Sequence, residues 1–192
     1  MKKLWIIIAV IVVVGGGAAI YFATKGDNKK STNLSGSTVS TPAGNVTVTY
    51  SPVNDACKVL TLADAQAVIG PTAKAGTATP QTSSADIEVS TCTYLTPIVG
   101  TDIHSIVNAS ILVRSAKTKT GANSNKAVFA ALPAGDQAVS GYGDSAYWSS
   151  ALGQLNILKH NNWYILSEGG TLPTEKTLDG TKKLADQIKN RL

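Results

Sequence analysis

The sequence lacks the short motifs that mark several large classes of enzyme. It has no G-x-S-x-G nucleophile elbow, no H-E-x-x-H zinc helix and no G-x-x-x-x-G-K-[ST] phosphate loop. Only two histidines, His104 and His160, could serve as bases, and the acidic residues are scattered along the chain. The leading interpretation is therefore a non-catalytic protein, with no catalytic, cofactor-binding or metal-binding residue assigned.

Basic residues are scarce outside the N-terminus, although the whole chain carries a net charge of +5. Residues 1–30 contain five lysines and one aspartate and therefore account for +4. Residues 31–192 contain twelve basic and eleven acidic residues, which leaves this part at +1. Because nucleic-acid binding needs a concentrated basic face, this distribution argues against a nucleic-acid partner.

The N-terminus does contain a long apolar segment. An unbroken run of 20 apolar or small residues begins at Leu4 and ends at Ala23. At ~1.5 Å per residue, a helix of this length spans the ~30 Å hydrocarbon core of a bilayer. Trp5 and Tyr21 stand near the two ends, where aromatic side chains favour the membrane interfaces. We therefore predict a transmembrane anchor within residues 1–25, with the membrane as its partner.

A signal peptide cleaved among the small residues 15–19 is the alternative interpretation of this run. The apolar run continues beyond that site, which favours an uncleaved anchor. A lipid-modified N-terminus is not expected, because no cysteine follows the run until Cys57. Flanking lysines barely fix the orientation, but the N-terminal tail is too short to be a domain. We expect a single-pass cell-membrane protein with a cytoplasmic N-terminus and an extracytoplasmic C-terminal domain.

Residues 26–52 are rich in Ser, Thr, Gly and Asn and cannot bury enough apolar surface to fold alone. We predict a flexible linker here, with one strand-like stretch at 45–50. The remaining residues, 53–192, have an ordinary length for one domain.

The spacing of apolar residues in 53–192 predicts an α+β fold. Helices are expected at 61–70, 122–132 and 173–192, and strands at 86–95, 107–115, 145–150 and 155–168. Thr61 and Asp64 form the capping pattern of the first helix, and Asn161-Asn162 marks a hairpin turn. In the strand at 107–115, Val107, Ala109, Ile111 and Val113 are expected on one face and Asn108, Ser110 and Arg114 on the other. Pro173 and Glu175 suit the first turn of the last helix, whose apolar stripe consists of Leu178, Leu184, Ala185, Ile188 and Leu192. Because hairpin connections dominate, we expect a mainly antiparallel sheet with two or three packed helices, preceded by the transmembrane helix.

The chain has only two cysteines, Cys57 and Cys92. In an oxidising compartment, two cysteines in one small domain usually pair. Closing a loop of this length stabilises the fold by ~3–4 kcal/mol in the chain-entropy model. A catalytic thiol would need a partnering base, which nothing in the sequence supplies, and a zinc site would need closer ligand spacing. We therefore predict a structural disulfide.

The stretch SGYGDSAYW, residues 140–148, looks most like a ligand-binding motif. A dinucleotide loop would need a third glycine and a following helix, whereas a strand follows here. We therefore interpret Gly141, Gly143 and Asp144 as a tight turn, with a ligand loop as the alternative.

Four aromatic residues are candidates for a stacking surface that could hold a sugar or an aromatic ligand. They are Tyr147, Trp148, Trp163 and Tyr164. At strand spacing, such residues more often lie in the core and at its rim, which is the interpretation we favour.

Five stretches occur in the order DACKVLTLADAQAVIG, STCTY, GYGDSAYW, LNILKHNNWYILSE and KLADQIKNRL. Together they resemble a bacterial envelope family of unknown function that is common among secreted actinobacterial lipoproteins. Its pattern opens C-x-L-L-T-x-x-E and continues with C-x-Y and G-x-G-D-x-A-Y. The chain departs from this pattern at Asp64-Ala65, where the family favours Glu, and in having an anchor instead of a lipidated cysteine.

The resemblance spans residues 55 to 192. It implies an exported α+β domain, with Cys57 and Cys92 as the disulfide pair and Gly143, Asp144 and Ala146 in the turn. It implies no activity.

Three interpretations of function follow. The leading one is a membrane-tethered, non-catalytic module that binds a component of the cell envelope. The second is a hydrolase or transferase acting on envelope glycan or peptide, with carboxylates such as Asp144 and Glu168. The third is an accessory subunit that docks on a membrane complex through its anchor and linker. None of them calls for a cofactor.

Overall fold

The computed structural model describes residues 50–192, apart from 51, 54, 77–80 and 132–135. Near the N-terminus it describes only the two-residue strands β1 (Val13–Val14) and β2 (Gly17–Ala18), which pair antiparallel. The rest of the expected anchor, the linker up to residue 49 and most of the strand-like stretch at 45–50 lie outside the described residues. Within the described residues, no helix is long and apolar enough to cross a membrane.

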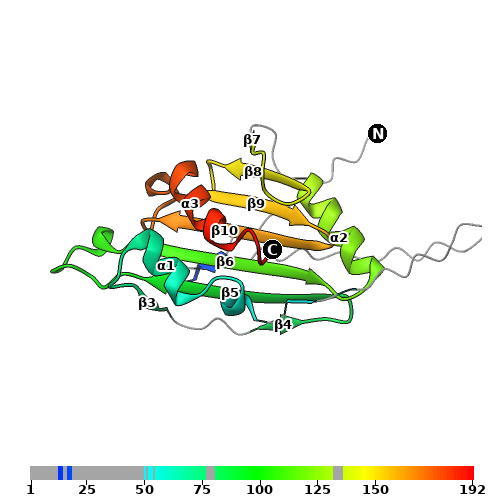
Figure 1. The fold of residues 1–192 in the computed structure, drawn as a ribbon, viewed down its shortest axis with the longest axis horizontal. Helices are drawn as coiled ribbons and strands as arrows, with labels where there is room; N and C mark the ends of the chain where they lie inside the picture. Colours follow the sequence, from blue (N-terminus) through cyan, green and yellow to red (C-terminus); the bar gives the residue numbers. More distant parts are fainter. Residues whose placement is uncertain are drawn as a thin grey trace, which may run out of the picture. The chain divides into compact units, whose positions relative to one another are not determined.

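The chain divides into two units, Met1–Thr47 and Val48–Leu192. The second unit is an α+β domain built on one eight-stranded sheet (Figure 1). Its strands lie in the order β3-β5-β6-β10-β9-β8-β7, β4 also pairs with β5, and every pairing is antiparallel. The expected α+β class and antiparallel sheet are confirmed.

The elements of this domain are bounded as follows. The strands are β3 (Lys74–Ala75), β4 (Thr82–Ser83), β5 (Ile87–Leu95), β6 (Asn108–Ala116), β7 (Gln137–Ala138), β8 (Ser145–Ser149), β9 (Gln154–Lys159) and β10 (Asn162–Gly169). The α-helices are α1 (Leu62–Ile69), α2 (Lys119–Ala130) and α3 (Leu178–Ile188). Short 3₁₀ helices are η1 (Ala56–Lys58), η2 (Ile103–Ser105) and η3 (Pro173–Glu175).

The helix boundaries follow from their caps. In α1, the Thr61 side chain accepts from the Asp64 N–H while the Asp64 carboxylate accepts from the Thr61 N–H, so the predicted capping box is confirmed. Helix α2 begins three residues before its predicted start because Thr118 caps it through the Gly121 N–H.

The predicted start of the last helix at Pro173 is wrong. Pro173 opens η3 instead, and the chain becomes extended again at Lys176, which forms a β-bridge with Gly169. Helix α3 begins only after Thr177, whose side chain accepts a hydrogen bond from the Gly180 N–H. Pro173 and Glu175 therefore belong to a helical turn, η3, that is separate from α3.

The hairpin between β9 and β10 turns one residue earlier than predicted. Asn162 is already the first residue of β10 and pairs with Lys159, so the two-residue loop is His160-Asn161. His160 has a positive φ of 56°. The Asn162 side chain instead accepts a hydrogen bond from the Ala116 N–H at 3.1 Å, which ties the hairpin to the end of β6.

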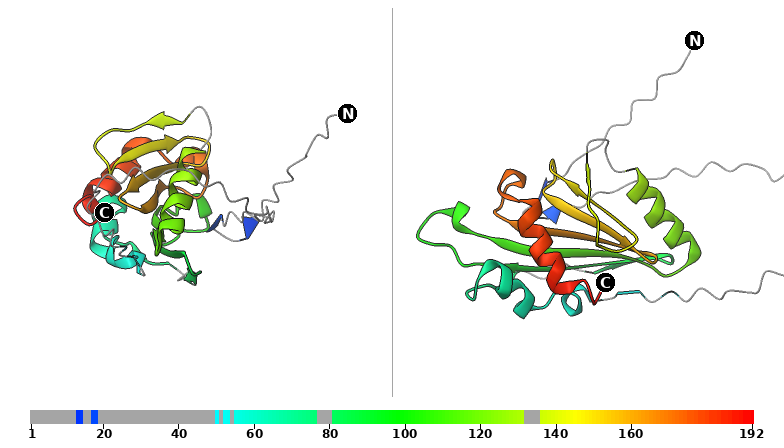
Figure 2. Two further views of the ribbon diagram at one scale, coloured as in Figure 1. Left: turned by 90° about the vertical axis from the view of Figure 1, so that its right-hand side faces the viewer. Right: turned by 45° about the horizontal axis from the view of Figure 1, so that its top comes forward.

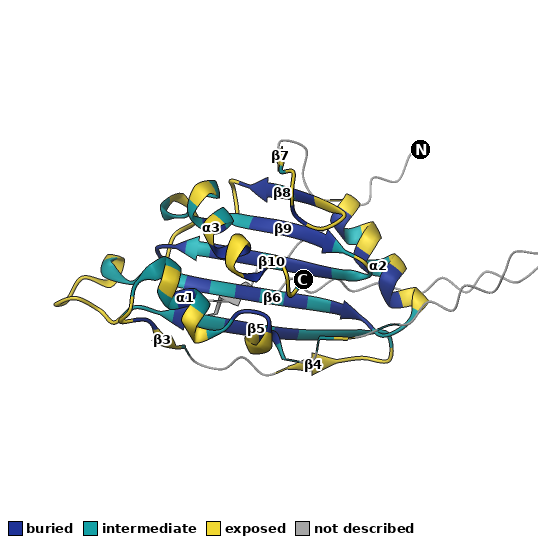
Figure 3. Ribbon diagram, in the orientation of Figure 1, coloured by how far each residue is buried: buried dark blue, intermediate teal, exposed yellow. Residues whose placement is uncertain are grey.

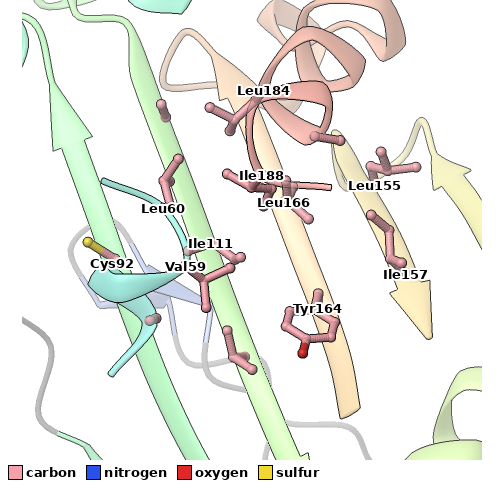
Figure 4. Close-up of a cluster of buried hydrophobic side chains, with 14 of the residues drawn as sticks. Val59, Leu60, Cys92, Ile111, Leu155, Ile157, Tyr164, Leu166, Leu184 and Ile188 are labelled. Carbon is pink, nitrogen blue, oxygen red and sulfur yellow. The ribbon is translucent and has the colours of Figure 1, made fainter. Parts of the chain in front are cut away.

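The principal core lies between the sheet and helices α1 and α3 (Figure 2). Leu184, Ala185 and Ile188 of α3 are fully buried against the sheet, as the apolar stripe of the sequence predicts. Figure 4 shows Leu184 and Ile188 against Ile111 and Leu166 of the neighbouring strands. These core residues all belong to Val48–Leu192, so this unit carries its own core and can fold by itself.

The predicted disulfide is confirmed. Cys57 of η1 is bonded to Cys92 of β5, 35 residues further along the chain. Cys92 faces the principal core. The bond therefore fastens the segment that leads into α1 onto the sheet.

Candidate functional site

The glycine-rich stretch before β8 is a bend in the loop closed by the Val139 N–H to Ala146 carbonyl bond, and its backbone fits closely against β9. Gly141 and Gly143 both have positive φ, 91° and 57°. A Cβ at Gly143 would lie 2.5 Å from the Leu158 carbonyl oxygen and 2.7 Å from Cγ2 of Ile157. Glycine is therefore required at 143 both by conformation and by space.

The other two residues of this turn are also engaged with the fold. Asp144 Oδ2 accepts a 2.6 Å hydrogen bond from the His160 N–H, and the Asp144 N–H donates to the Leu158 carbonyl at 2.7 Å. Tyr142 is buried and its hydroxyl donates to Asp186 of α3 at 3.2 Å. Burial and the nearby Asp186 carboxylate raise the pKa of Tyr142 to about 12. These contacts support the turn interpretation over the ligand loop.

The four candidate aromatic residues do not form one surface. Trp148 and Tyr164 belong to the principal core, whereas Trp163 packs with Phe129 of α2 on the opposite face. Tyr147 lies on that second face as well, with its ring 4.4 Å from the Phe129 ring. The four residues therefore lie in the core and at its rim, as favoured, and do not form the alternative stacking surface, because neighbouring residues of a strand point to opposite faces of the sheet.

The two carboxylates proposed for the enzyme interpretation lie far apart. Asp144 is bonded to His160 in the β9–β10 turn, whereas Glu168 lies six residues beyond Asn162 along β10. At ~3.3 Å per residue, the β9–β10 turn beside Asp144 is ~20 Å from Glu168. Glycosidase carboxylate pairs are at most ~10 Å apart. This pair therefore cannot act on one bond.

Glu168 has a structural position beneath α3. Its carboxylate lies against Gly180, where a Cβ would collide with it. Burial raises the pKa of Glu168, and the positive charge of Lys183 partly offsets this. The glycine at 180 thus makes room for a half-buried carboxylate at the start of the helix.

The histidines have no common partner in the described part of the chain. His104 Nδ1 lies 3.1 Å from Glu175 Oε1, and His160 is a turn residue. The described residues contain no group of three or more His, Cys, Asp or Glu side chains that could hold a metal ion.

The sheet face that carries α2 offers a different kind of site. Registers between strands place Thr93, Ser110 and Ser167 side by side in one row across β5, β6 and β10. The adjacent row contains Thr91, Leu112, Ile165, Asn156 and Tyr147. Tyr147 packs against Phe129 of α2. We call the other half-buried members of these rows, together with Gln154, the open face: Thr91, Thr93, Ser110, Leu112, Gln154 and Ile165.

Helix α2 covers only one end of this sheet face. Phe129 packs on Leu158 and Trp163 there, and Arg114 is held by Asn125 Oδ1 at 2.5 Å and by Ser124 Oγ at 3.1 Å. Arg114, which follows Leu112 on the same face of β6, is therefore tied to the helix. The open face itself offers hydroxyl, amide and aliphatic groups without any charge.

One buried polar atom marks the edge of this surface. Ser149 lies beside Gln154 in the sheet and is only 1% exposed, and its hydroxyl oxygen has no hydrogen-bond partner among the described residues.

Sequence reasoning missed the open face as a site, although a signal was present. Alternation in 107–115 predicts that Asn108, Ser110 and Arg114 share the face opposite the core. That face is confirmed, since Ala109, Ile111 and Val113 on the other side are fully buried. The neighbours of Ser110 on the adjacent strands depend on pairing registers that the sequence does not reveal.

Comparison with known proteins gives no match: no family model, no curated protein and no solved structure matches this chain. Function is therefore argued from the residues and their geometry.

Proposed function

We propose that this protein is a membrane-tethered, extracytoplasmic binding module that performs no catalysis and holds an uncharged component of the cell envelope on its open face. The open face is the observation that carries the proposal. It joins hydroxyl and amide groups from three strands with the aliphatic side chains of Leu112 and Ile165. Such a surface can donate and accept hydrogen bonds and contact carbon skeletons, but it holds no acid, base or nucleophile activated by a base.

The location is supported by three features. The 20-residue apolar run from Leu4 to Ala23 has the length of a transmembrane helix. The disulfide between Cys57 and Cys92 belongs in an oxidising compartment. The resemblance of the five ordered stretches to exported envelope proteins also supports this location. In this account, residues 26–52 are the spacer between the membrane and the domain.

Binding to envelope material tests the proposal. Residues 48–192 are mixed with washed insoluble envelope fragments from the source cells, and the sedimented fraction is measured. The parent domain is expected to sediment. Ser110→Lys places a long cation in the centre of the open face and should weaken binding about tenfold, equivalent to ~1.4 kcal/mol.

Thr120→Lys is the matched control, because it adds the same charge on the exposed side of α2. It should bind like the parent, and both variants should melt near the parent temperature. Equal binding by Ser110→Lys and the parent would contradict the open face as the site. An equal loss of binding in both variants would indicate a non-specific charge effect and would also contradict the open face as the site.

A further inference from the structure

Large apolar side chains gather in the loops at one end of the sheet. Val99 is 72% exposed, Ile103 59%, Ile98 52%, Leu172 48% and Leu152 40%. They come from three loops: the β5–β6 loop, the β8–β9 turn and the connection from β10 to α3. We call these five residues the apolar tip. Leu62 of α1, 39% exposed, lies outside these loops.

Hydrogen bonds and close packing hold the three loops together. His104 of the β5–β6 loop pairs with Glu175 of η3, and the Asn108 side chain donates to the Gly170 carbonyl at 2.9 Å. In the β8–β9 turn, Gly153 packs against Lys176 and Pro173. The exposed apolar side chains therefore belong to one continuous end of the domain. The β5–β6 loop projects beyond the strand ends and is exposed over residues 97–104 (Figures 1 and 3).

We propose that the apolar tip inserts into the surface of a lipid bilayer. Its exposed area is a few hundred Å², which is less than the ~800 Å² per partner of a stable protein interface. A fluid lipid surface requires neither that area nor a matching shape. Residues 96–107 contain no Lys or Arg, so attraction to the bilayer must come from apolar burial instead of headgroup charge.

The proximity of a bilayer to this domain rests on the proposed membrane tether. The chain enters the domain at the other end of the sheet, where Val53 bonds to Ser115 near the end of β6. The nine-residue strands β5 and β6 are ~30 Å long. A flexible linker over residues 26–52 has an average reach of ~30 Å and a maximum of ~90 Å. The domain can therefore fold back and place its tip on the membrane.

Hydrogen exchange on vesicles tests the insertion without using the natural anchor. Residues 48–192 carry an N-terminal hexahistidine tag followed by a Gly/Ser spacer as long as residues 26–52, and bind phosphatidylcholine vesicles that contain a nickel-chelating lipid. We expect amide exchange in 96–107 to slow at least ~fivefold on the vesicles. Exchange in the turns at 141–144 and 160–161, at the opposite end, should stay unchanged. High salt should leave the protection intact, because no headgroup charge is involved.

Two variants complete the experiment. The double variant Val99→Asp with Ile103→Asp should lose the protection while still attached through the tag. Leu62→Asp, which removes an exposed leucine elsewhere, should keep it. The proposal is overturned if vesicles do not slow exchange in 96–107, or if the protection disappears in high salt. It is also overturned if the same protection arises without vesicles as protein concentration rises, which would identify a second copy as the occupant. Because the tag replaces residues 1–47, these results do not depend on whether the natural tether exists.

Discussion

Asp144 accepts a 2.6 Å hydrogen bond from the backbone N–H of His160, so the turn before β8 is fastened to the turn between β9 and β10. The two turns lie at the same end of the sheet, and each contains a residue with positive φ. This bond gives a structural reason for the aspartate in the G-x-G-D motif. It also supplies a way to separate a structural role from a ligand-binding role.

Asp144→Ala should destabilise residues 48–192 by ~1 kcal/mol, because the His160 N–H loses its acceptor on an exposed surface where water partly replaces it. Asp144→Asn should cost less than half as much, since an amide oxygen can still accept. Urea unfolding measures both values. An Asp144→Asn protein that keeps full stability but no longer sediments with envelope fragments would favour the ligand-loop interpretation instead.

Gly143→Ala should cost ~2–4 kcal/mol, because the new Cβ meets the Leu158 carbonyl in addition to the strain of positive φ. Gly141→Ala is the matched control, since Gly141 has positive φ but no heavy atom of the described residues lies within 4 Å of the added Cβ. It should cost only ~1 kcal/mol. The comparison uses melting temperatures of residues 48–192. Equal melting of the two variants would show that the close approach at 143 is absent in solution.

The ion pair between Asp64 and Arg191 predicts a pH-dependent contribution to stability. Arg191 Nη2 lies 2.5 Å from Asp64 Oδ2, and Arg191 Nε donates to the Val59 carbonyl. Burial raises the pKa of Asp64, but hydrogen bonds from Thr61 and the charge of Arg191 outweigh this, so the net pKa is lowered.

A carboxylate with a lowered folded-state pKa stabilises the fold above its unfolded pKa of ~4, and loses that effect as pH falls through the folded value. Arg191→Met should therefore cost ~1–2 kcal/mol at pH near 7, allowing for solvent screening of the partly exposed guanidinium. The difference from the parent should shrink below pH ~3. Urea unfolding between pH ~3 and ~7 measures this difference in stability. A difference that does not change with pH would contradict an electrostatic contribution from the Asp64–Arg191 pair.

Loss of the disulfide should lower the free energy of unfolding by ~3–4 kcal/mol, as the chain-entropy estimate for a 35-residue separation gives. The parent domain should melt at a lower temperature in reducing agent. The Cys57→Ser, Cys92→Ser double variant should melt at that lower temperature with or without reductant. If reductant leaves the melting of the parent unchanged while free thiols appear, the bond contributes nothing to stability.

The parts of the fold that the sequence predicted are those set by local signals. The capping box of Thr61 and Asp64, the alternation of Ala109, Ile111 and Val113, and the stripe of Leu184 and Ile188 each correspond to a confirmed element. The errors lie where tertiary contacts decide. His160 takes the positive φ that Asn161-Asn162 predicted, because pairing of Asn162 with Lys159 fixes the turn one residue earlier.

The candidate site was harder to predict for the same reason. Tyr147 and Trp148 are neighbours in sequence but point to opposite faces of the sheet. The aromatic residues that are close in sequence therefore pack in two separate clusters. Ser110 and Thr93 are distant in sequence but lie side by side across β6 and β5. A surface built from several strands appears only once their registers are known.

Protease treatment of intact cells tests the central claim, that the domain is tethered outside the membrane, most directly. A protease that cannot cross the membrane should cut within residues 26–52 and release a soluble fragment of ~140–160 residues that resists further digestion. The disulfide between Cys57 and Cys92 should be intact in that fragment before any reductant is added. Protection of the whole chain until the membrane is broken would contradict the account, because it would place the domain inside the cell.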